Sequence, residues 1–282
     1  MNTIQRQTTV NCRGRLLSLD KPKVMGIINI TPDSFYEESR FTTAETIAAQ
    51  AQKHIDEGAE IIDIGAFSTR PGCKEVSEKE ETERLDLALQ AIRKINEDVI
   101  ISVDTFRSNV AKMVTENYNV GIINDISAGY FDPKLFETVA QTNAAYILMH
   151  SIGNPLEKHQ TAQCENITDN VITFFYEKAD ALRQAGVKDI ILDSGFGFGK
   201  TIDQNYELLS RMDDLKIFEL PILVGVSRKS MIFKLLETDP AHSLNGTSVI
   251  NTIAIAKGAD ILRVHDVKQA VEVIKICQKT GY

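Results

Sequence analysis

The chain has 282 residues, of which 43% are hydrophobic and 25% are charged. A chain of this length and apolar content can bury a large core, which excludes a small domain held together mainly by disulfides. Its formal charge of −8 argues against general binding to nucleic acid or to anionic membranes. An anionic ligand would therefore need a local group of cations.

The cysteines and the opening residues point to a cytoplasmic protein. The four cysteines (Cys12, Cys73, Cys164 and Cys277) are scattered and form no C-x-x-C pair, so neither a zinc site nor a redox motif is encoded. The opening residues contain no apolar segment of a secretory signal, and no apolar run approaches the length of a membrane span. We therefore expect reduced cysteines and a cytoplasmic location.

Short apolar segments alternate with helical stretches along the whole chain. Near-continuous apolar runs are typical of parallel strands that are covered on both faces. The predicted strands are residues 24–30, 60–65, 99–104, 120–125, 144–150, 189–193, 221–227 and 260–266. Between them, capping-box pairs predict the start of three helices, at Thr42–Glu45, Ser77–Glu80 and Thr201–Gln204.

A repeated unit supports this alternation. Gly58, Gly186 and Gly258 each follow a helical stretch and precede an apolar strand, as expected of helix-ending glycines in the left-handed conformation. Eight strands alternating with helices favour a TIM (β/α)8 barrel. An open, doubly wound sheet is the alternative, because alternation alone does not distinguish the two. We expect residues 1–22 to form a short hairpin across the bottom of the barrel and residues 1–282 to form one domain.

Polar residues stand at the ends of nearly all the predicted strands. In barrel enzymes these ends carry the chemistry, although Asp and Asn at such places also simply open turns. Five cations map to this end and predict a positively charged mouth of the barrel that binds a phosphate or diphosphate. They are Arg70, Arg228, Lys229, Arg263 and His265. The alternative is a structural ion-pair network with Asp63, Asp104 and Asp193. Asn29 is a candidate ligand for a Mg²⁺ ion held mainly by substrate phosphates.

The segment DSGFGFGKT (193–201) comes close to a phosphate-binding loop. Gly199, Lys200 and Thr201 fit that pattern, but Ser194 occupies the place of its first glycine. A P-loop nucleotidase is one alternative, although its loop should follow the first strand rather than the sixth. We interpret the glycines as allowing the backbone to approach a flat ligand, and Lys200 and Thr201 as opening a helix.

Eight motifs together resemble those of the dihydropteroate synthase family, in that family's order and over nearly the whole chain. They are NITPDSF (29–35), STRPG (68–72), SVDT (102–105), NDIS (124–127), LMH (148–150), DSGFGFGK (193–200), SRKS (227–230) and RVHDV (263–267). Ala66-Phe67 replaces the usual Gly-Glu before STRPG, and Ser194 replaces a usual proline.

The resemblance implies a TIM-barrel transferase of folate biosynthesis. Such enzymes join 6-hydroxymethyl-7,8-dihydropterin diphosphate to p-aminobenzoate, giving 7,8-dihydropteroate and pyrophosphate, and they need Mg²⁺. Family members are cytoplasmic homodimers and sulfonamide targets. Among the matching positions, the catalytic roles fall on Asp104, Lys229, Arg263 and His265.

The resemblance also assigns binding roles by position. Pterin binding falls on Asp104, Asn124, Ile126, Met149, Asp193, Gly225 and Lys229. The diphosphate, with its Mg²⁺, falls to Asn29, Arg70, Arg263 and His265. The p-aminobenzoate site is implied at Phe35, Thr69, Pro71, Phe198, Lys229 and Ser230.

Two other functions compete with this interpretation. A methyltetrahydrofolate methyltransferase would share the pterin-binding Asp and Asn residues but would need a corrinoid protein partner and no diphosphate site. A catalytically silent pterin-binding module would lose the anion-binding residues, and the presence of Asn29, Arg70, Arg263 and His265 argues against it.

Overall fold

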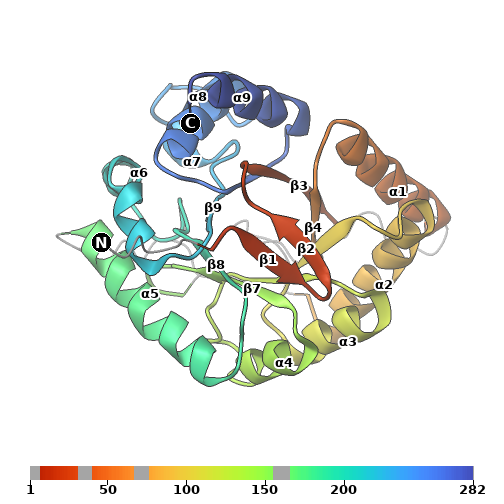
Figure 1. Cartoon of the computed structure of the whole chain (residues 1–282). Helices are drawn as coiled ribbons and strands as arrows, with labels where there is room; N and C mark the ends of the chain where they lie inside the picture. The colour runs from red at the N-terminus through yellow and green to blue at the C-terminus, as the bar shows by residue number, and fades with distance from the viewer. Residues whose placement is uncertain (1–6, 31–39, 67–75, 155–165, 282) are drawn as a thin grey trace.

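Eight parallel strands close into a barrel (Figure 1). The computed structural model describes residues 7–30, 40–66, 76–154 and 166–281. Around the barrel the strand order is β10–β3–β4–β5–β6–β7–β8–β9. The strands are β3 (Lys23–Asn29), β4 (Ile61–Gly65), β5 (Ile100–Asp104), β6 (Ile122–Asp125), β7 (Ala145–Met149), β8 (Ile190–Asp193), β9 (Ile222–Val224) and β10 (Ile261–Val264).

The closed ring confirms the predicted barrel and rules out the open sheet. Each predicted strand is present, but β9 ends three residues before the predicted 221–227 segment does. The chain leaves the sheet at Gly225 and turns at Arg228, whose φ is 55°. That turn places Lys229 at the start of the next helix rather than at the end of a strand.

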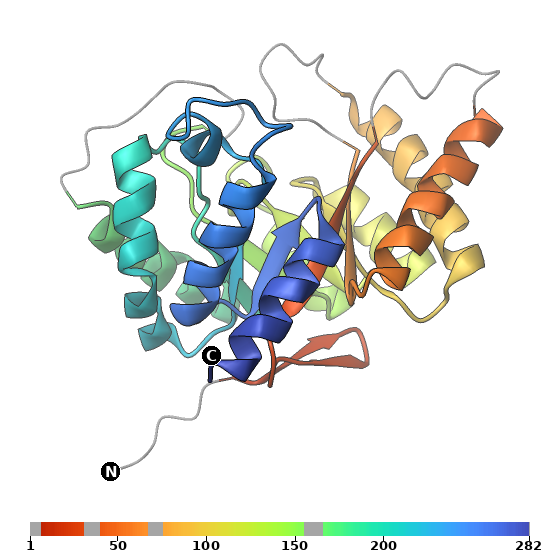
Figure 2. The ribbon, with the colours of Figure 1, turned by 90° about the horizontal axis from the view of Figure 1, so that it is seen from above.

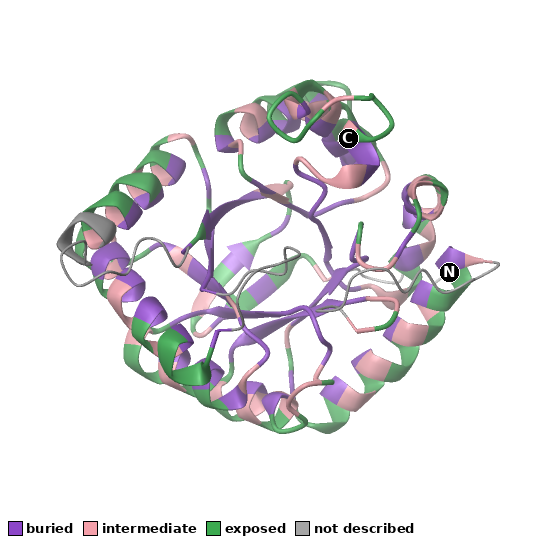
Figure 3. Ribbon diagram, turned by 180° about the vertical axis from the view of Figure 1, so that it is seen from behind, coloured by how far each residue is buried: buried purple, intermediate pink, exposed green. Residues whose placement is uncertain are grey.

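Helices surround the barrel with their buried faces inward and their exposed faces in solvent (Figures 1 and 3). They are α1 (Arg40–Asp56), α2 (Glu78–Ile95), α3 (Ser108–Tyr118), α4 (Leu135–Thr142), α5 (Ile167–Gln184), α6 (Ile202–Ser210), the 3-10 helix η3 (Met212–Phe218), α7 (Ser230–Phe233), α8 (Leu244–Ala256) and α9 (Val267–Lys279).

Local sequence signals account for several helix ends. Capping boxes at Ser77 and Thr201 begin α2 and α6, as predicted. The predicted start at Thr42 is wrong, because α1 already begins at Arg40. Gly58, Gly186 and Gly258 have φ values of 101°, 94° and 102°, the left-handed conformation that ends a helix at low cost.

An N-terminal hairpin closes the bottom of the barrel (Figure 2). It consists of β1 (Thr9–Cys12) paired with β2 (Arg15–Ser18). Its buried side chains join the cluster that fills the barrel interior, whose members are Val10, Cys12, Leu17, Leu19, Met25, Ile61, Ile122, Ala145, Ile147, Ile191, Leu223 and Ile261. The interior is therefore a packed core at this end, which leaves the opposite end for polar groups.

Within the described part of the chain, Cys12 and Cys277 are buried free thiols. Among the same residues, no helix is both long and apolar enough to cross a membrane.

Candidate active site

The strand register brings five predicted site residues to the C-terminal end of the barrel. Asn29 is paired with Gly65, Gly65 with Asp104, and Asp104 with Asn124. Further round the barrel, Met149 is paired with Asp193. Residues from five strands therefore lie at one end, as expected of a barrel active site.

The centre of this group is an ion pair between Arg263 on β10 and Asp63 on β4. The Arg263 Nε and Nη2 atoms lie 2.7 and 2.6 Å from the Asp63 Oδ2 atom. The other carboxylate oxygen accepts hydrogen bonds from the Ser102 hydroxyl at 2.6 Å and the Asn124 amide at 3.4 Å. Asp63 is fully buried, whereas the Arg263 side chain remains 18% exposed. The pair thus anchors a guanidinium that still reaches the surface.

Asp104 lies beside this pair and is the carboxylate most open to a ligand. Its Oδ2 atom is 3.6 Å from Arg263 Nη2, and 22% of its side chain is exposed. Burial raises the pKa of Asp104 to about 7, because the cation of Arg263 only partly offsets the cost of burying its charge and Asp63 adds repulsion. Asp104 is therefore a carboxylate whose charge changes near neutral pH.

Asp193 and Asn124 provide a second set of buried polar groups. The Asp193 Oδ1 atom accepts a hydrogen bond from the Gly195 N–H at 2.8 Å. Burial raises the pKa of Asp193, and the nearby ammonium of Lys229 opposes that rise. Asn124 is 3% exposed and Asp193 is 5% exposed. Oriented acceptors and donors of this kind can match the edge of a heterocycle.

An apolar cluster adjoins these polar groups. Phe106, Ile126 and Met149 are buried together, and the partly buried Phe131 and Phe198 pack against them. Ile126 and Met149 come from chain segments that end β6 and β7. The cluster therefore offers an apolar surface beside the polar Asn124 and Asp193.

Lys229 links the apolar and polar parts of the site. Its ammonium donates to the Phe196 carbonyl at 2.7 Å and lies 4.8 Å from the centre of the Phe198 ring. Burial lowers its pKa to about 8, although the charge of Asp193 works in the opposite direction. Gly225 lies between the two cations, because an ideal Cβ there would be 3.9 Å from the Lys229 ammonium and from the Arg263 side chain.

Three further predicted residues lie around the rim. His265 is exposed, and its Nδ1 atom is 3.0 Å from the Ser227 hydroxyl, which also accepts from the His265 backbone N–H. Ser230 is the first residue of α7 and is half-buried. Asn29 is exposed at the end of β3. Phe35, Thr69, Arg70 and Pro71 lie outside the described residues.

One expectation about the cations needs correction, and one alternative is confirmed. Arg228 does not join the predicted mouth, because its guanidinium binds both oxygens of Asp266 at 2.9 Å. Arg263 does take part in an ion-pair network with Asp63 and Asp104, as the alternative proposed. A partly exposed guanidinium held in this way is compatible with anion binding, so the two interpretations coexist.

The glycine-rich loop does not have the role that we expected, which was to let the backbone approach a flat ligand. A Cβ at Gly195 would stand 1.8 Å from the His150 carbonyl oxygen, and one at Gly199 would stand 2.3 Å from that of Ile152. These glycines therefore allow close approach to the protein's own backbone rather than to a flat ligand. Lys200 points into the interior, with 7% of the residue exposed, so it cannot serve a phosphate-binding loop.

Sequence reasoning gave no binding role to the residues that orient Arg263 and His265. Asp63 was predicted only as an ion-pair partner, and the contacts of Ser102 and Ser227 were not predicted. A single acid inside the apolar strand IIDIG was the available signal for Asp63. Nothing local to Ser102 or Ser227 reveals a partner on another strand.

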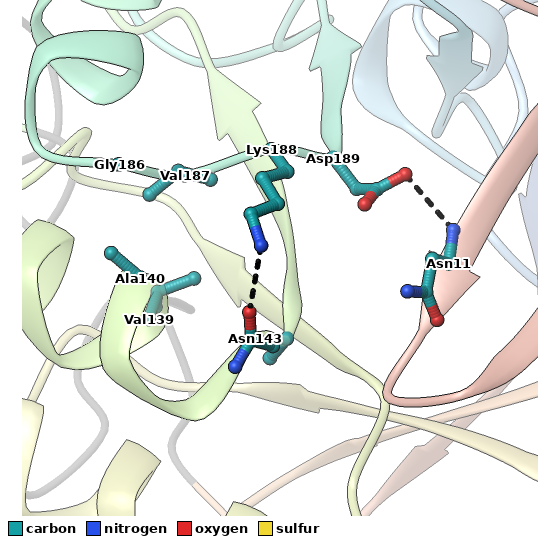
Figure 4. A pocket seen from close by; sticks show the side chains of 9 residues that line it. Asn11, Val139, Ala140, Asn143, Gly186, Val187, Lys188 and Asp189 are labelled. Carbon is teal, nitrogen blue, oxygen red and sulfur yellow. Dashed lines mark hydrogen bonds between the residues drawn. The ribbon is translucent and has the colours of Figure 1, made fainter.

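A small cavity at the opposite end of the barrel is not a substrate site. It lies between the hairpin and the segment 186–189, where Asp189 accepts from the Asn11 N–H at 2.9 Å and Lys188 donates to Asn143 at 3.4 Å (Figure 4). It is small, with a volume of about 40 Å³, and it lies away from the polar strand ends.

The donor set around Asn29 fits a Mg²⁺ ion that brings its own oxygen ligands. Among the described residues no group of three or more His, Cys, Asp or Glu side chains is arranged to hold a metal. The Asn29 Oδ1 atom and the Asp104 carboxylate both flank Gly65, at 3.6 and 3.8 Å from an ideal Cβ there. One amide oxygen beside one carboxylate suits a magnesium ion coordinated mainly by phosphates and water.

Comparisons with known proteins agree with this geometry. A model of the pterin binding enzyme family matches residues 25–265. The chain is 41% identical to dihydropteroate synthase of Escherichia coli over 95% of both chains, and 43% identical to that of Synechocystis over 90% of this chain and 88% of the relative.

Solved structures of dihydropteroate synthases have the same architecture. Dihydropteroate synthase of Xanthomonas albilineans with 4-aminobenzoic acid superposes with a TM-score of 0.88 at 33% identity, covering 97% of this chain and 98% of the other. The Yersinia pestis enzyme in a sulfonamide complex gives 0.89 at 38% identity, covering 97% and 99%.

The chain therefore belongs to the pterin binding enzyme family. Within that family it belongs to the dihydropteroate synthases, which are transferases.

Proposed function

We propose that this chain joins 6-hydroxymethyl-7,8-dihydropterin diphosphate to p-aminobenzoate at the C-terminal end of the barrel, and that the products are 7,8-dihydropteroate and pyrophosphate. The observation that carries the proposal is the arrangement of Arg263 and Asp104 beside buried Asn124 and Asp193. An anion-binding group and a heterocycle-binding group thus lie next to each other. The reaction needs both.

The pterin lies between the polar and the apolar groups. Asp104, Asn124 and Asp193 bind its edge, and Ile126 and Met149 contact its ring. Lys229 donates a hydrogen bond to the pterin carbonyl, and Gly225 leaves room for the ring beside that lysine. Buried carboxylates and amides recognise such a fixed pattern of donors and acceptors because wrong partners leave them unpaired.

The diphosphate is the leaving group. Arg263 and His265, together with Arg70, bind its oxygens and stabilise the negative charge that grows as the methylene C–O bond breaks. The electron pair of that bond departs with the pyrophosphate. The methylene becomes electron-poor, and the Asp104 carboxylate stabilises this positive charge electrostatically.

The amine of p-aminobenzoate then attacks the methylene. Its lone pair forms the new C–N bond, and the amine loses a proton to solvent or to the departing pyrophosphate. Phe198, Lys229 and Ser230 surround this second substrate, with Phe35, Thr69 and Pro71 completing its binding site. Neither the bond broken nor the bond formed requires a protein nucleophile.

Asn29 is the protein ligand that would hold Mg²⁺ against the diphosphate. When bound, the ion supplies neutralisation of phosphate charge. Asn29 contributes a neutral oxygen, so it fixes the ion without adding a charge that would repel the substrate.

The chain assembles as a cytoplasmic homodimer through one face of α8. Val249 and Ile253 are four residues apart, so they share a helix face, and they are 51% and 39% exposed. Leu236, which is 53% exposed, has its Cδ1 atom 3.0 Å from an ideal Cβ on Gly246, one turn before Val249. These three exposed apolar side chains lie on or beside one face of α8, and exposed apolar patches mark association surfaces.

The test is turnover by the purified protein. With Mg²⁺, the pterin diphosphate and p-aminobenzoate, it should release pyrophosphate and form dihydropteroate in equal amounts. A folded protein that binds the pterin but gives no product under these conditions would contradict the proposal. Methyl transfer to a corrinoid protein would instead support the methyltransferase alternative.

A further inference from the structure

Lys200 places a buried cation behind the loop of residues 194–199. Its ammonium donates to the carbonyl oxygens of Gly195 at 2.8 Å, His150 at 3.3 Å and Phe198 at 3.4 Å. Three acceptors match the three N–H donors of an ammonium group. The donors of this lysine are therefore directed at the protein's own backbone.

The three carbonyls belong to two segments that lie backbone to backbone. Gly195 and Gly199 have φ values of 61° and 67° and approach His150 and Ile152 too closely for any side chain. The Ile152 N–H also donates to the Phe198 carbonyl at 3.4 Å. Lys200 is the cation that joins the segment 150–152 to the loop 194–199.

Both joined segments carry side chains of the candidate site. Met149 directly precedes His150, and its Cγ atom lies 3.2 Å from an ideal Cβ on Gly195. Phe198 is in the loop itself and lies under the Lys229 ammonium. Lys229 in turn donates to the Phe196 carbonyl at 2.7 Å. The loop is thus held on its site-facing side by Lys229 and from behind by Lys200.

We propose that Lys200 is a positioning residue of the transfer reaction, which fixes Phe198 relative to Met149 so that the second substrate meets the pterin methylene in line. The inference rests on the proposed function. Burial lowers the pKa of Lys200 to about 7. In its charged form, its hydrogen bonds to three carbonyls hold the glycine-rich loop more firmly than neutral ones. Small displacements of a substrate-positioning group can cost about 10²-fold in rate.

The decisive variant is Lys200→Met, which keeps the length of the side chain and removes its donors and charge. We expect the KM for p-aminobenzoate to rise about tenfold and kcat to fall about tenfold, because the loop with Phe198 moves away. The Kd for the pterin diphosphate should change less than about threefold, because the pterin contacts on the strands remain. Lys200→Arg, which keeps the cation, should recover part of the lost affinity.

Thr201→Ala is the matched control. Thr201 caps α6 through its side chain and is the next residue in the chain, but it points to the exposed helix start. This variant should lower Tm and leave both KM values unchanged. If Lys200→Met likewise lowers Tm with wild-type KM values and kcat, Lys200 is purely structural and the inference is overturned.

A second variant covers the case in which Lys200→Met does not fold. Asn205 accepts from the Gly197 N–H at 2.7 Å and donates to the Lys200 carbonyl at 3.3 Å, so it holds the same loop from another side. Asn205→Ala should also raise the KM for p-aminobenzoate selectively, and an unchanged KM contradicts the inference. Wild-type turnover is measured alongside, so that failure of the proposed function is seen separately.

Discussion

Arg263 and Asp63 are 200 residues apart in the chain, yet their side chains form a buried ion pair at 2.6 Å. Strand β3 stands between their strands in the barrel. The pair therefore spans one strand at the end where the candidate site lies. It fixes a guanidinium in one direction, and the Asn124 amide shares the same carboxylate. The groups proposed to bind the diphosphate and the pterin are thus connected through the Asp63 carboxylate.

The first prediction concerns Asp63→Asn. Removing Asp63 leaves Arg263 with only the more distant Asp104 carboxylate at 3.6 Å, which should cost about 3 kcal/mol in the free energy of unfolding. Arg263 also loses its orientation, so kcat/KM for the pterin diphosphate should fall about 10²-fold. Denaturant unfolding and steady-state kinetics measure the two effects.

Ser102→Ala is the control for this prediction. It removes one hydrogen bond to Asp63 and leaves the ion pair in place. We expect a loss of about 1 kcal/mol in stability and a change in kcat/KM of less than about fivefold. Equal kinetic effects of the two substitutions would show that the pair does not orient Arg263.

The second prediction is a bell-shaped pH dependence of kcat/KM, which reports the free enzyme. Asp104 acts as a carboxylate, and its raised pKa of about 7 means that activity is lost as the pH falls through that value. Lys229 acts as an ammonium, and its lowered pKa of about 8 means that activity is lost as the pH rises through that value. Asp104→Asn should remove the acidic limb and Lys229→Met the alkaline limb, each at a lower maximal rate. A flat profile in the wild type between about pH 6 and pH 9 contradicts both assignments.

The third prediction concerns magnesium. Chelation of Mg²⁺ should abolish turnover, and its return should restore it. Asn29→Ala should raise the Mg²⁺ concentration needed for half-maximal activity about tenfold, because one oxygen ligand is lost. Binding of a pterin that lacks the diphosphate should be unaffected. A loss of that binding would place Asn29 at the pterin instead of at the metal.

The fourth prediction tests the apolar patch on α8. Val249→Lys combined with Ile253→Glu puts two charges on a face that is buried in the proposed dimer, so the variant should sediment as a monomer. Tyr176→Lys on α5 changes another exposed apolar residue, 73% exposed, and should leave a dimer. Sedimentation equilibrium distinguishes the species. If the double variant remains dimeric, the interface lies elsewhere.

The fifth prediction treats the hairpin and the barrel as one domain. Leu17 is 4% exposed and packs in the barrel interior. Leu17→Ala should lower the free energy of unfolding by about 3 kcal/mol, in a single transition that circular dichroism and fluorescence report together. The neighbouring Leu16 is 73% exposed, so Leu16→Ala should have little effect. Two separated transitions would show that the hairpin unfolds by itself.

The strands and the positions of the site residues could be predicted because their signals are local. The apolar run 60–65, which follows the helix-ending Gly58, predicts β4 to within a few residues. Parallel strands all end at one side of the sheet. The sequence therefore also predicts that Asp104, Asn124 and Asp193 lie together there. Even so, the strand at 221–227 was predicted too long, because the left-handed turn at Arg228 is set by contacts with Asp266 and the loop at Pro240 and Ala241.

By itself, the sequence determined the number and order of the strands, the ends at which polar residues gather, and the family motifs. The tertiary structure alone decided that the sheet closes, that Arg263 faces Asp63, that Arg228 is paired with Asp266, and that Lys200 turns inward. Periodicity, caps and turn residues act over a few positions, so they can be recognised in the sequence. The partner of a charge depends on distance and burial in space, and only the closed barrel sets these.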